Sequence, residues 1–295
     1  MSIATDSLLR ERSAAAELQG ATFYQSKTKP LLSYYLYRPE QPVCRGRLLV
    51  SVHGVSRNAE EHVELFRPYA DRYGAVLLAP LFEPDDFRDY QRLGRKGKGP
   101  RADLALIRVL NEVKTQFGWD TSQVDLFGFS GGAQFAHRFA FAHPQRVRSI
   151  ALGAPGWYTM PDRSLSYPHG TADSEGLEAV RFNAAAAARL RTLVMVGEND
   201  NRTDDEELNT TRIICQTQGE NRLQRARTWT KAMNALSTKS GGAGQVDMVK
   251  LPKVDHSFRD AVLEGGLATL LFNHCYAAAE TYWSTAAAAA ETRTG

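Results

Sequence analysis

The sequence predicts one α/β domain, built on a mostly parallel central sheet with helices on both faces. Three observations support this prediction. Short, continuously apolar runs recur along the chain and alternate with stretches of helical spacing. Strands that are separated by helices form parallel sheets, and both faces of such sheets are buried. The 295 residues show no internal repeat, and 43% of them are hydrophobic, which is enough for one large core.

Seven segments are predicted to be strands, because they are short, apolar and bounded by glycine, proline or polar residues. Residues 47–52 and 75–80 are the clearest, since nearly every position in them is apolar, as expected for strands buried on both faces. The complete set is 31–37, 47–52, 75–80, 124–127, 147–152, 190–196 and 245–251.

Five helices are predicted from apolar residues that recur every three or four positions. The helix over 101–117 has the strongest pattern, and Gly118 follows its last turn as a stop signal. The complete set is 59–73, 101–117, 131–142, 222–235 and 260–275. We expect the irregular stretch 153–184 to form a small lid-like insertion, and the low-complexity tail 286–295 to fray, within a single domain that spans 1–295.

The composition argues against several function classes. Lys and Arg (36) nearly balance Asp and Glu (33), so the net charge of +3 gives no reason to expect a nucleic-acid partner. Cys44, Cys215 and Cys275 lie far apart and lack metal-ligand spacing, so we expect reduced thiols and no metal. No phosphate-binding glycine loop or dinucleotide fingerprint is visible, so we expect no cofactor. Because no apolar run has the length of a signal peptide core or a membrane span, we expect a cytoplasmic protein without a membrane partner.

Gly128-Phe129-Ser130-Gly131-Gly132 is the most informative motif. It lies between a predicted strand and a predicted helix, which is the arrangement of a nucleophile elbow. The turn is so tight that only glycines tolerate the backbone approach on either side of the serine. It lifts the serine hydroxyl out of the sheet and brings the N–H of Gly131 to a helix N-terminus, where it can stabilise an oxyanion.

An acid and a histidine follow Ser130 in the order that this architecture requires. Asp200 comes just after the strand 190–196, and His256 comes just after the strand 245–251. Catalytic groups of parallel α/β sheets lie at the carboxyl ends of strands, so both positions suit a triad. The imidazole would take the serine proton and the carboxylate would orient the imidazole.

Other acids and histidines near these positions remain alternatives. Glu198, Asp204 and Asp205 compete with Asp200 for the role of the acid, and Asp255 is a weaker choice because it lies beside His256. The remaining histidines fit less well, because none of them has the same placement at the end of a late strand.

The turn after the strand 47–52 carries His53 and Gly54. In this architecture such a turn supplies the second oxyanion donor, so we expect the N–H of Val55 to act together with that of Gly131. For His53 itself a structural role is favoured over a catalytic one.

Taken together, the elbow, Asp200, His256 and the His53-Gly54 turn resemble the α/β-hydrolase superfamily over nearly the whole chain. The segment from His53 to Ala59 is similar to the His-Gly-x-x-x-Asn-Ala turn of polyhydroxybutyrate-depolymerase-like and feruloyl-esterase-like hydrolases. This resemblance implies a serine esterase that cleaves carboxylic esters through an acyl-enzyme. We expect a small soluble ester as substrate, because the signal peptide, cysteine framework and polymer-binding domain of the secreted members are not seen in this sequence.

Two alternatives to a serine esterase stay open. A serine peptidase or amidase would use the same triad, and a non-catalytic binding protein could be built on the same scaffold. The second is disfavoured because every catalytic position holds a competent residue. The oligomeric state is left open by the sequence.

Three further segments are expected to lie around the predicted site. Trp157 and Tyr158, in the irregular stretch, either line an acyl pocket as exposed aromatics or pack that stretch against the protein. The basic loop 88–101 follows the strand 75–80 and is either a solvated loop or a source of positive potential that steers an anionic substrate. The polar segment 201–219 is expected to be a rim element beside Asp200.

Overall fold

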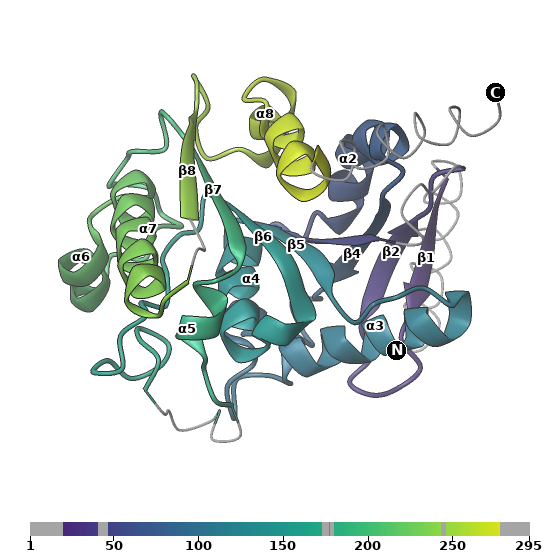
Figure 1. Ribbon diagram of the computed structural model, residues 1–295, viewed down its shortest axis with the longest axis horizontal. Helices are drawn as coiled ribbons and strands as arrows, with labels where there is room; N and C mark the ends of the chain where they lie inside the picture. The colour runs from purple at the N-terminus through teal and green to yellow at the C-terminus, as the bar shows by residue number, and fades with distance from the viewer. Residues whose placement is uncertain (1–19, 41–46, 173–176, 178–179, 243–245, 278–295) are drawn as a thin grey trace.

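The computed structural model describes residues 20–40, 47–172, 177, 180–242 and 246–277. Within these residues one eight-stranded sheet runs through the molecule, in the order β1-β2-β4-β3-β5-β6-β7-β8 (Figure 1). Strands β3 to β8 are parallel to one another, whereas β1 and β2 are antiparallel to their neighbours at one edge. The predicted fold class, a mostly parallel sheet with helices on both faces, is confirmed. The strands are β1 (Ala21–Gln25), β2 (Ser33–Tyr37), β3 (Leu48–Val52), β4 (Val76–Leu81), β5 (Val124–Phe129), β6 (Val147–Gly153), β7 (Arg191–Gly197) and β8 (Val246–Leu251).

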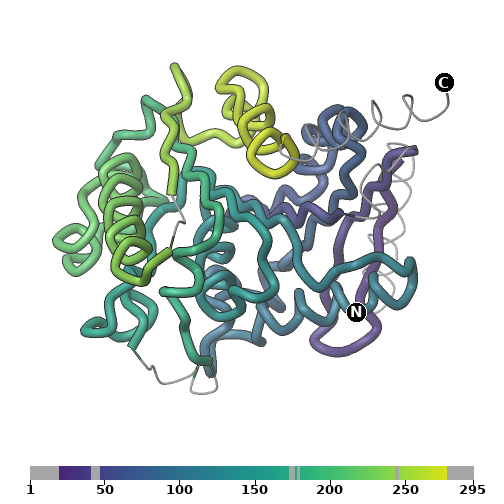
Figure 2. The backbone as a smooth tube through the Cα atoms, viewed as in Figure 1, coloured from purple at the N-terminus to yellow at the C-terminus, as the bar shows by residue number. Residues whose placement is uncertain are grey.

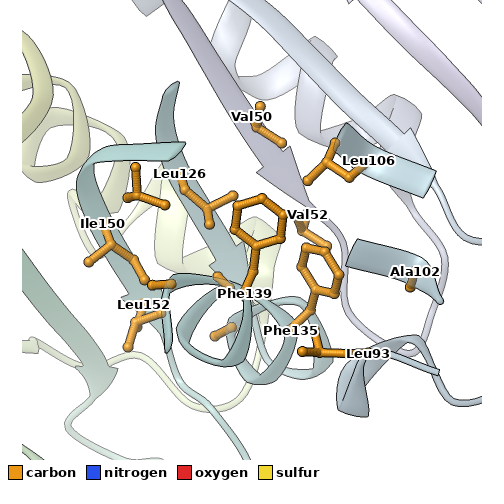
Figure 3. Close-up of a cluster of buried hydrophobic side chains, with 14 of the residues drawn as sticks. Val50, Val52, Leu93, Ala102, Leu106, Leu126, Phe135, Phe139, Ile150 and Leu152 are labelled. Carbon is orange, nitrogen blue, oxygen red and sulfur yellow. The ribbon is translucent and has the colours of Figure 1, made fainter. Parts of the chain in front are cut away.

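The central strands are buried on both faces because their apolar residues alternate between two cores. In β3, Leu48, Val50 and Val52 belong to one buried cluster, and Leu49 belongs to the cluster on the opposite face. Successive side chains of a strand point to opposite faces, so an all-apolar strand contributes to both. Figure 3 shows the first cluster, where Val52 lies opposite Phe135 of the helix that follows β5.

Helices cover the two faces of the sheet (Figure 1). The face that carries Leu106, Phe135 and Trp229 is covered by α3, α4 and α7, whereas the other face is covered by α2 and α8 through Phe66 and Phe258. Figure 2 shows the chain after α8 running back beside α2. The helices are α2 (Ala59–Tyr73), α3 (Ala102–Phe117), α4 (Gly131–Ala142), α5 (Ala184–Ala187), α6 (Arg212–Gln218), α7 (Arg222–Lys239) and α8 (Phe258–Leu263), with short 3₁₀ turns η1 (Tyr90–Arg92) and η2 (Pro144–Arg146).

Two segments differ from the sequence-based expectation, and a third is not tested. The edge strand Ala21–Gln25 was not anticipated; it pairs with β2 through a row of aromatic contacts such as Phe23 against Tyr35. The helix expected over 260–275 is divided, because Gly266 adopts a φ of 72° and a second helical segment begins at Leu267. The tail 286–295 lies outside the described residues.

The start of α4 lies in direct backbone contact with the end of β3. A β-carbon built on Gly132 would lie 2.0 Å from the carbonyl oxygen of Val52 and 2.5 Å from that of His53. A β-carbon on Gly128 would lie 2.2 Å from the carbonyl oxygen of Gly132. Only glycine fits at these two positions, and this is what lets the strand, the turn and the helix meet so closely.

Three histidines of the described chain, His53, His62 and His137, are buried. Each ring is neutral, because burial lowers the pKa of His53 to about 3 and lowers the pKa values of His62 and His137 well below the ordinary value. His137 on α4 accepts a hydrogen bond at Nε2 from the N–H of Thr159 and donates from Nδ1 to the carbonyl of Ala133. This pairing of both ring nitrogens accounts for a histidine in the core.

The Gly132 contact predicts a large loss of stability on adding a single methyl group. We expect Gly132→Ala to lower the free energy of unfolding by more than about 3 kcal/mol, since backbone atoms cannot move aside as a side chain can. Gly118→Ala is the control: Gly118 follows the last turn of α3, with a φ of 69°, and its β-carbon would meet no atom within 4 Å. That variant should lose about 1 kcal/mol, the cost of the left-handed conformation. Urea denaturation of both variants checks this, and equal losses would contradict it.

The buried histidines predict a stability that falls with acid. Below about pH 6.5 the unfolded chain binds a proton at each of the three rings while the folded chain does not, so the free energy of unfolding decreases as the pH falls. Each ring contributes about 1.4 kcal/mol per pH unit to this slope. We expect His137→Gln to remove one such contribution between about pH 5.5 and 4.5, as measured by denaturation at several pH values. An unchanged slope would show that His137 is charged in the folded protein.

Candidate active site

Ser130 lies at the sharp turn between β5 and α4. Its backbone has a φ of 50° and a ψ of −112°, a conformation that a residue with a side chain rarely adopts. The turn is held by two hydrogen bonds: the N–H of Ser130 donates to the carbonyl of Gly153 over 2.7 Å, and its carbonyl accepts from the N–H of Gln134 over 3.1 Å. The strained turn therefore presents the Ser130 hydroxyl beyond the end of the sheet.

The turns after β7 and β8 are locked together by their backbones. The N–H of Glu198 donates to the carbonyl of Leu251 over 2.8 Å, and the N–H of Asn199 donates to that of Val254 over 2.9 Å. The contact is close because a β-carbon on Gly197 would lie 2.3 Å from the carbonyl oxygen of Val254. Two neighbouring parallel strands thus bring the residues that follow each of them to one place.

The structure brings Ser130, His256 and Asp200 into one hydrogen-bonded chain. His256 Nε2 lies 3.0 Å from Ser130 Oγ, and Nδ1 lies 2.7 Å from Asp200 Oδ2. A carboxylate oxygen only accepts, so Nδ1 carries the proton and Nε2 is free to accept from the serine hydroxyl. The ring of His256 also stacks on that of Phe129, with centroids 5.4 Å apart. An imidazole held in this way can take the proton of a serine that attacks a carbonyl.

The competing acids have other partners. Glu198 faces Lys250, and Asp204 is paired with Arg202 on the surface. Asp255 accepts a hydrogen bond from the backbone N–H of His256. Asp205 reaches Asp200 only through a shared arginine, so Asp200 is the acid that contacts the imidazole.

That shared arginine, Arg222, was not anticipated from the sequence. It begins α7, is 2% exposed, and its Nη1 donates to Asp200 Oδ1 over 3.1 Å and to Asp205 Oδ2 over 2.5 Å. Asp200, equally buried, therefore has one oxygen on the imidazole and the other on a guanidinium. An arginine in the first turn of an amphipathic helix ordinarily faces solvent, so no local pattern distinguishes Arg222.

His53 fixes the turn that approaches Ser130 from β3. Its Nε2 accepts from the N–H of Phe82 over 3.0 Å, and its Nδ1 donates to the carbonyl of Gly54 over 2.7 Å. Both ring nitrogens are occupied, which suits a structural role. A β-carbon on Gly54 would lie 3.4 Å from Ser130 Cβ, so the turn leading to Val55 lies directly beside the serine.

Gly131, the other expected oxyanion donor, begins α4 immediately after Ser130. A β-carbon there would lie 2.7 Å from Tyr90 Oη and 2.8 Å from Gln91 Nε2. Tyr90 and Gln91 belong to η1, within the basic loop 88–101 that the sequence placed around the site. The Tyr90 hydroxyl donates to the carbonyl of His53, so η1 also supports the turn on the other side of Ser130.

Trp157 and Tyr158 are buried, which agrees with the second of the two roles considered for them, the packing of the irregular stretch against the protein. Tyr158 is 0% exposed and stacks on Trp229 of α7, with centroids 5.0 Å apart, so it is a core residue and not a wall of an open pocket. Trp157 is 3% exposed and packs its ring against the guanidinium of Arg138, 4.3 Å away. Both rings face inward because β6 ends beside α4, whose side chains they cover.

The basic loop 88–101 is largely packed against the protein. Asp89 and Tyr90 are buried, and Asp89 binds Arg92 over 2.9 Å and Arg95 over 2.9 Å. Farther along, Arg101 is paired with the buried Asp103. The loop is therefore a folded, ion-paired element and not a freely solvated one. The segment 201–219 contains the short helix α6, and Arg225 ties it down through the carbonyls of Gly219 and Asn209.

Two further searches concern only the described part of the chain. No group of three or more histidine, cysteine, aspartate or glutamate residues there has the arrangement of a metal site. Nor does any helix among those residues have the length and hydropathy of a membrane span.

Comparison with curated proteins gives one informative similarity, while no protein-family profile matches the chain. Feruloyl esterase B from Talaromyces funiculosus is 26% identical over 146 residues, which make up 48% of this chain and 40% of that protein. The similarity therefore spans less than half of the relative's length.

Comparison with solved structures gives similarities over most of the chain. Poly(aspartic acid) hydrolase-1 from Sphingomonas sp. KT-1 is 22% identical, with a TM-score of 0.72 over 86% of this chain and 98% of that one. A poly(3-hydroxybutyrate) depolymerase from Bordetella parapertussis is 24% identical, with a TM-score of 0.70 over 88% and 92% of the two chains. These similarities, with the elbow and sheet described above, identify the chain as a protein of the α/β-hydrolase fold that resembles poly(3-hydroxybutyrate) depolymerases and feruloyl esterases.

Proposed function

We propose that this protein is a serine esterase that cleaves carboxylic esters through an acyl-enzyme. The observation that carries the proposal is the hydrogen-bonded chain from Ser130 Oγ through the His256 ring to the buried Asp200 carboxylate. The printed names of its relatives, a feruloyl esterase and a poly(3-hydroxybutyrate) depolymerase, support ester chemistry. The proposed reaction uses only side chains and backbone N–H groups of the protein, and it requires no metal ion and no cofactor.

In the proposed mechanism Ser130 attacks the ester carbonyl while His256 Nε2 takes the hydroxyl proton. The negative charge that develops on the carbonyl oxygen is stabilised by the N–H groups of Val55 and Gly131, and by the N-terminus of α4. His256 then gives the proton to the leaving alcohol. A water molecule, activated by the same imidazole, releases the acid and restores the serine.

We propose a small-molecule ester as the substrate and no nucleic-acid or membrane partner. A cytoplasmic location remains a prediction. Amide cleavage by the same residues is the nearest alternative, and it places a stronger demand on protonation of the leaving group. Matched ester and anilide substrates separate the two reactions.

The proposal predicts that activity depends on one hydroxyl. We expect Ser130→Ala to lower kcat for p-nitrophenyl esters by about 10⁴- to 10⁶-fold, because the nucleophile is lost while the fold is kept. Ser122→Ala is the matched control: this serine is exposed on the turn before β5, at the opposite end of the strand from Ser130. Its activity should equal that of the wild type.

A fluorophosphonate should also label the wild type at Ser130 and leave Ser130→Ala unlabelled, as read by peptide mass spectrometry. Substantial ester turnover in a folded Ser130→Ala protein would contradict the assignment. Turnover of anilides in preference to esters would replace the esterase by an amidase.

Arg222 is proposed as a positioning residue, because it fixes the Asp200 oxygen that the imidazole does not use. We expect Arg222→Met to lower kcat by about 100-fold with little change in KM, since a displaced carboxylate leaves the imidazole poorly oriented. Arg222→Lys should recover part of the loss, because it retains the positive charge. Steady-state kinetics at several pH values provide the measurement.

Asp205→Asn is the companion variant. It removes the charge of the second acid that Arg222 binds, while the contact between Arg222 and Asp200 stays intact. We expect it to change kcat by less than about threefold. If Arg222→Met lowers thermal stability but leaves kcat unchanged, Arg222 has only a structural role.

A further inference from the structure

Positive charge is concentrated beside the start of α4, on the face of the site formed by η1. The guanidinium groups of Arg92 and Arg138 both pack on the ring of Trp157, at 5.6 Å and 4.3 Å from its centroid. Arg95, three residues after Arg92, is bound to the same carboxylate, Asp89. We refer to Arg92, Arg95 and Arg138 with Asp89 and Trp157 as the arginine cluster.

The arginine cluster holds more positive than negative charge. Asp89 is its one carboxylate, and it already binds both Arg92 and Arg95. Arg138 bonds to neutral groups, namely the hydroxyl of Thr159 and the carbonyls of Gln91 and Gln134. The neighbouring acid Asp103 is engaged by Arg101 and His143.

Arg138 is the least compensated of the three arginines. It is fully buried, and within the described part of the chain its Nη2 has no hydrogen-bond partner. Burial lowers the pKa of Arg138 to about 9. Burial, followed by the charges of Arg138, Arg92 and Arg95, also lowers the pKa of His169, whose ring is tilted against that of Trp157 with centroids 5.3 Å apart. A buried cation without a counter-ion is costly, so an anion nearby would be favourable.

The arginine cluster adjoins the candidate catalytic residues. Gln91, which precedes Arg92, has its amide against Gly131, the residue after Ser130. On the other side, Gly156 precedes Trp157, and a β-carbon there would lie 3.1 Å from the amide nitrogen of Gln134, one helical turn after Ser130. The residues that directly precede Arg92 and Trp157 thus lie against the first turn of α4, which begins right after Ser130.

Solvent reaches part of the arginine cluster. The side chains of Arg92 and Arg95 are 29% and 26% exposed, whereas that of Asp89 is 6% exposed. The carboxylate thus lies beneath the two guanidinium groups, which face outward. Arg92 uses Nη1 for Asp89, and its other nitrogens make no hydrogen bond to the described residues. These donors suit a carboxylate, which guanidinium groups bind through charge-assisted hydrogen bonds.

We propose that the arginine cluster is a subsite for a carboxylate of the substrate, so that the preferred esters carry a free acid group. The inference rests on the proposed esterase function and deepens it by naming a substrate class. Arg92 binds the acid group, and Arg95 and Arg138 add positive potential behind it. Trp157 keeps Arg92 and Arg138 apart and shields the subsite from water.

Two pairs of substrates test the proposal. One pair places the carboxylate on the acyl side of the ester, and the other places it on the alcohol side. Mono-p-nitrophenyl glutarate and p-nitrophenyl pentanoate differ in a carboxylate at the end of the acyl chain. The second pair, 4-carboxyphenyl butyrate and 4-(methoxycarbonyl)phenyl butyrate, differs in a carboxylate on the alcohol. In at least one pair we expect kcat/KM to be about tenfold higher for the charged ester. Raising NaCl from about 0.02 M to about 0.5 M should reduce that ratio.

Arg92→Gln should abolish the preference for the charged ester, and Arg92→Lys should retain part of it. Arg88→Gln is the matched control, because Arg88 lies on the same loop but is 74% exposed and 3.9 Å from its partner Asp85. It should keep the wild-type ratio. A ratio near one in the wild type for both pairs, or a ratio that Arg92→Gln leaves unchanged, would overturn the proposal.

A binding measurement separates this proposal from the esterase function. Calorimetry with Ser130→Ala should detect glutarate but not pentanoate, and Arg92→Gln in that background should lose the glutarate signal. This result would support the subsite even if none of the esters were hydrolysed, in which case only the esterase proposal fails. Neutral-ester turnover that requires Ser130, without glutarate binding, would retain the esterase and reject the subsite.

Discussion

The close backbone contact between Gly132 and the end of β3 determines where every other part of the site can lie. It sets the start of α4 against the turn that carries His53 and Gly54, so that the two segments expected to supply the oxyanion donors both adjoin Ser130. A helix so close to the sheet is buried on nearly all sides, and most residues of α4 are accordingly small or aromatic. The very high burial of α4, including His137 and Arg138, follows from this one constraint.

Two clusters of buried charge flank the site, and they are balanced differently. Around Asp200, one guanidinium and two carboxylates meet with a histidine ring, so the negative charge is shared between Arg222 and His256. Around Asp89 two guanidinium groups share one carboxylate, and the buried guanidinium of Arg138 nearby bonds only to neutral groups. Burying ions costs free energy that their attraction repays only when partners are close and well oriented. The charges of the first cluster are paired with one another, whereas the second cluster keeps guanidinium donors that have no partner in the described part of the chain.

The sequence was sufficient to predict the parallel strands, the long helices and the positions of Ser130, Asp200 and His256, because each depends on local patterns: apolar runs, helical spacing, and acidic or imidazole side chains just past a strand. It was insufficient for Arg222, whose partner lies 22 residues away in the chain and meets it only after α7 packs. The sequence also could not decide whether Trp157 and Tyr158 are buried or exposed. An irregular, aromatic-rich stretch has no helical or strand periodicity from which the direction of each side chain can be predicted. The break before Leu267 had a local signal in Gly265 and Gly266, but the apolar pattern continues across it.

The stacking of Phe129 on His256 connects the residue that precedes Ser130 with the ring that is proposed to take the serine proton. Phe129 directly precedes Ser130, and it also contacts Phe258, two residues after His256. Phe258 in turn lies flat on His62 of α2, with ring centroids 3.8 Å apart. A ring enclosed in this way has few rotamers to lose when a substrate binds, so little conformational entropy opposes the reaction. Much of the order that the reaction requires is therefore acquired when the chain folds, before any ester arrives.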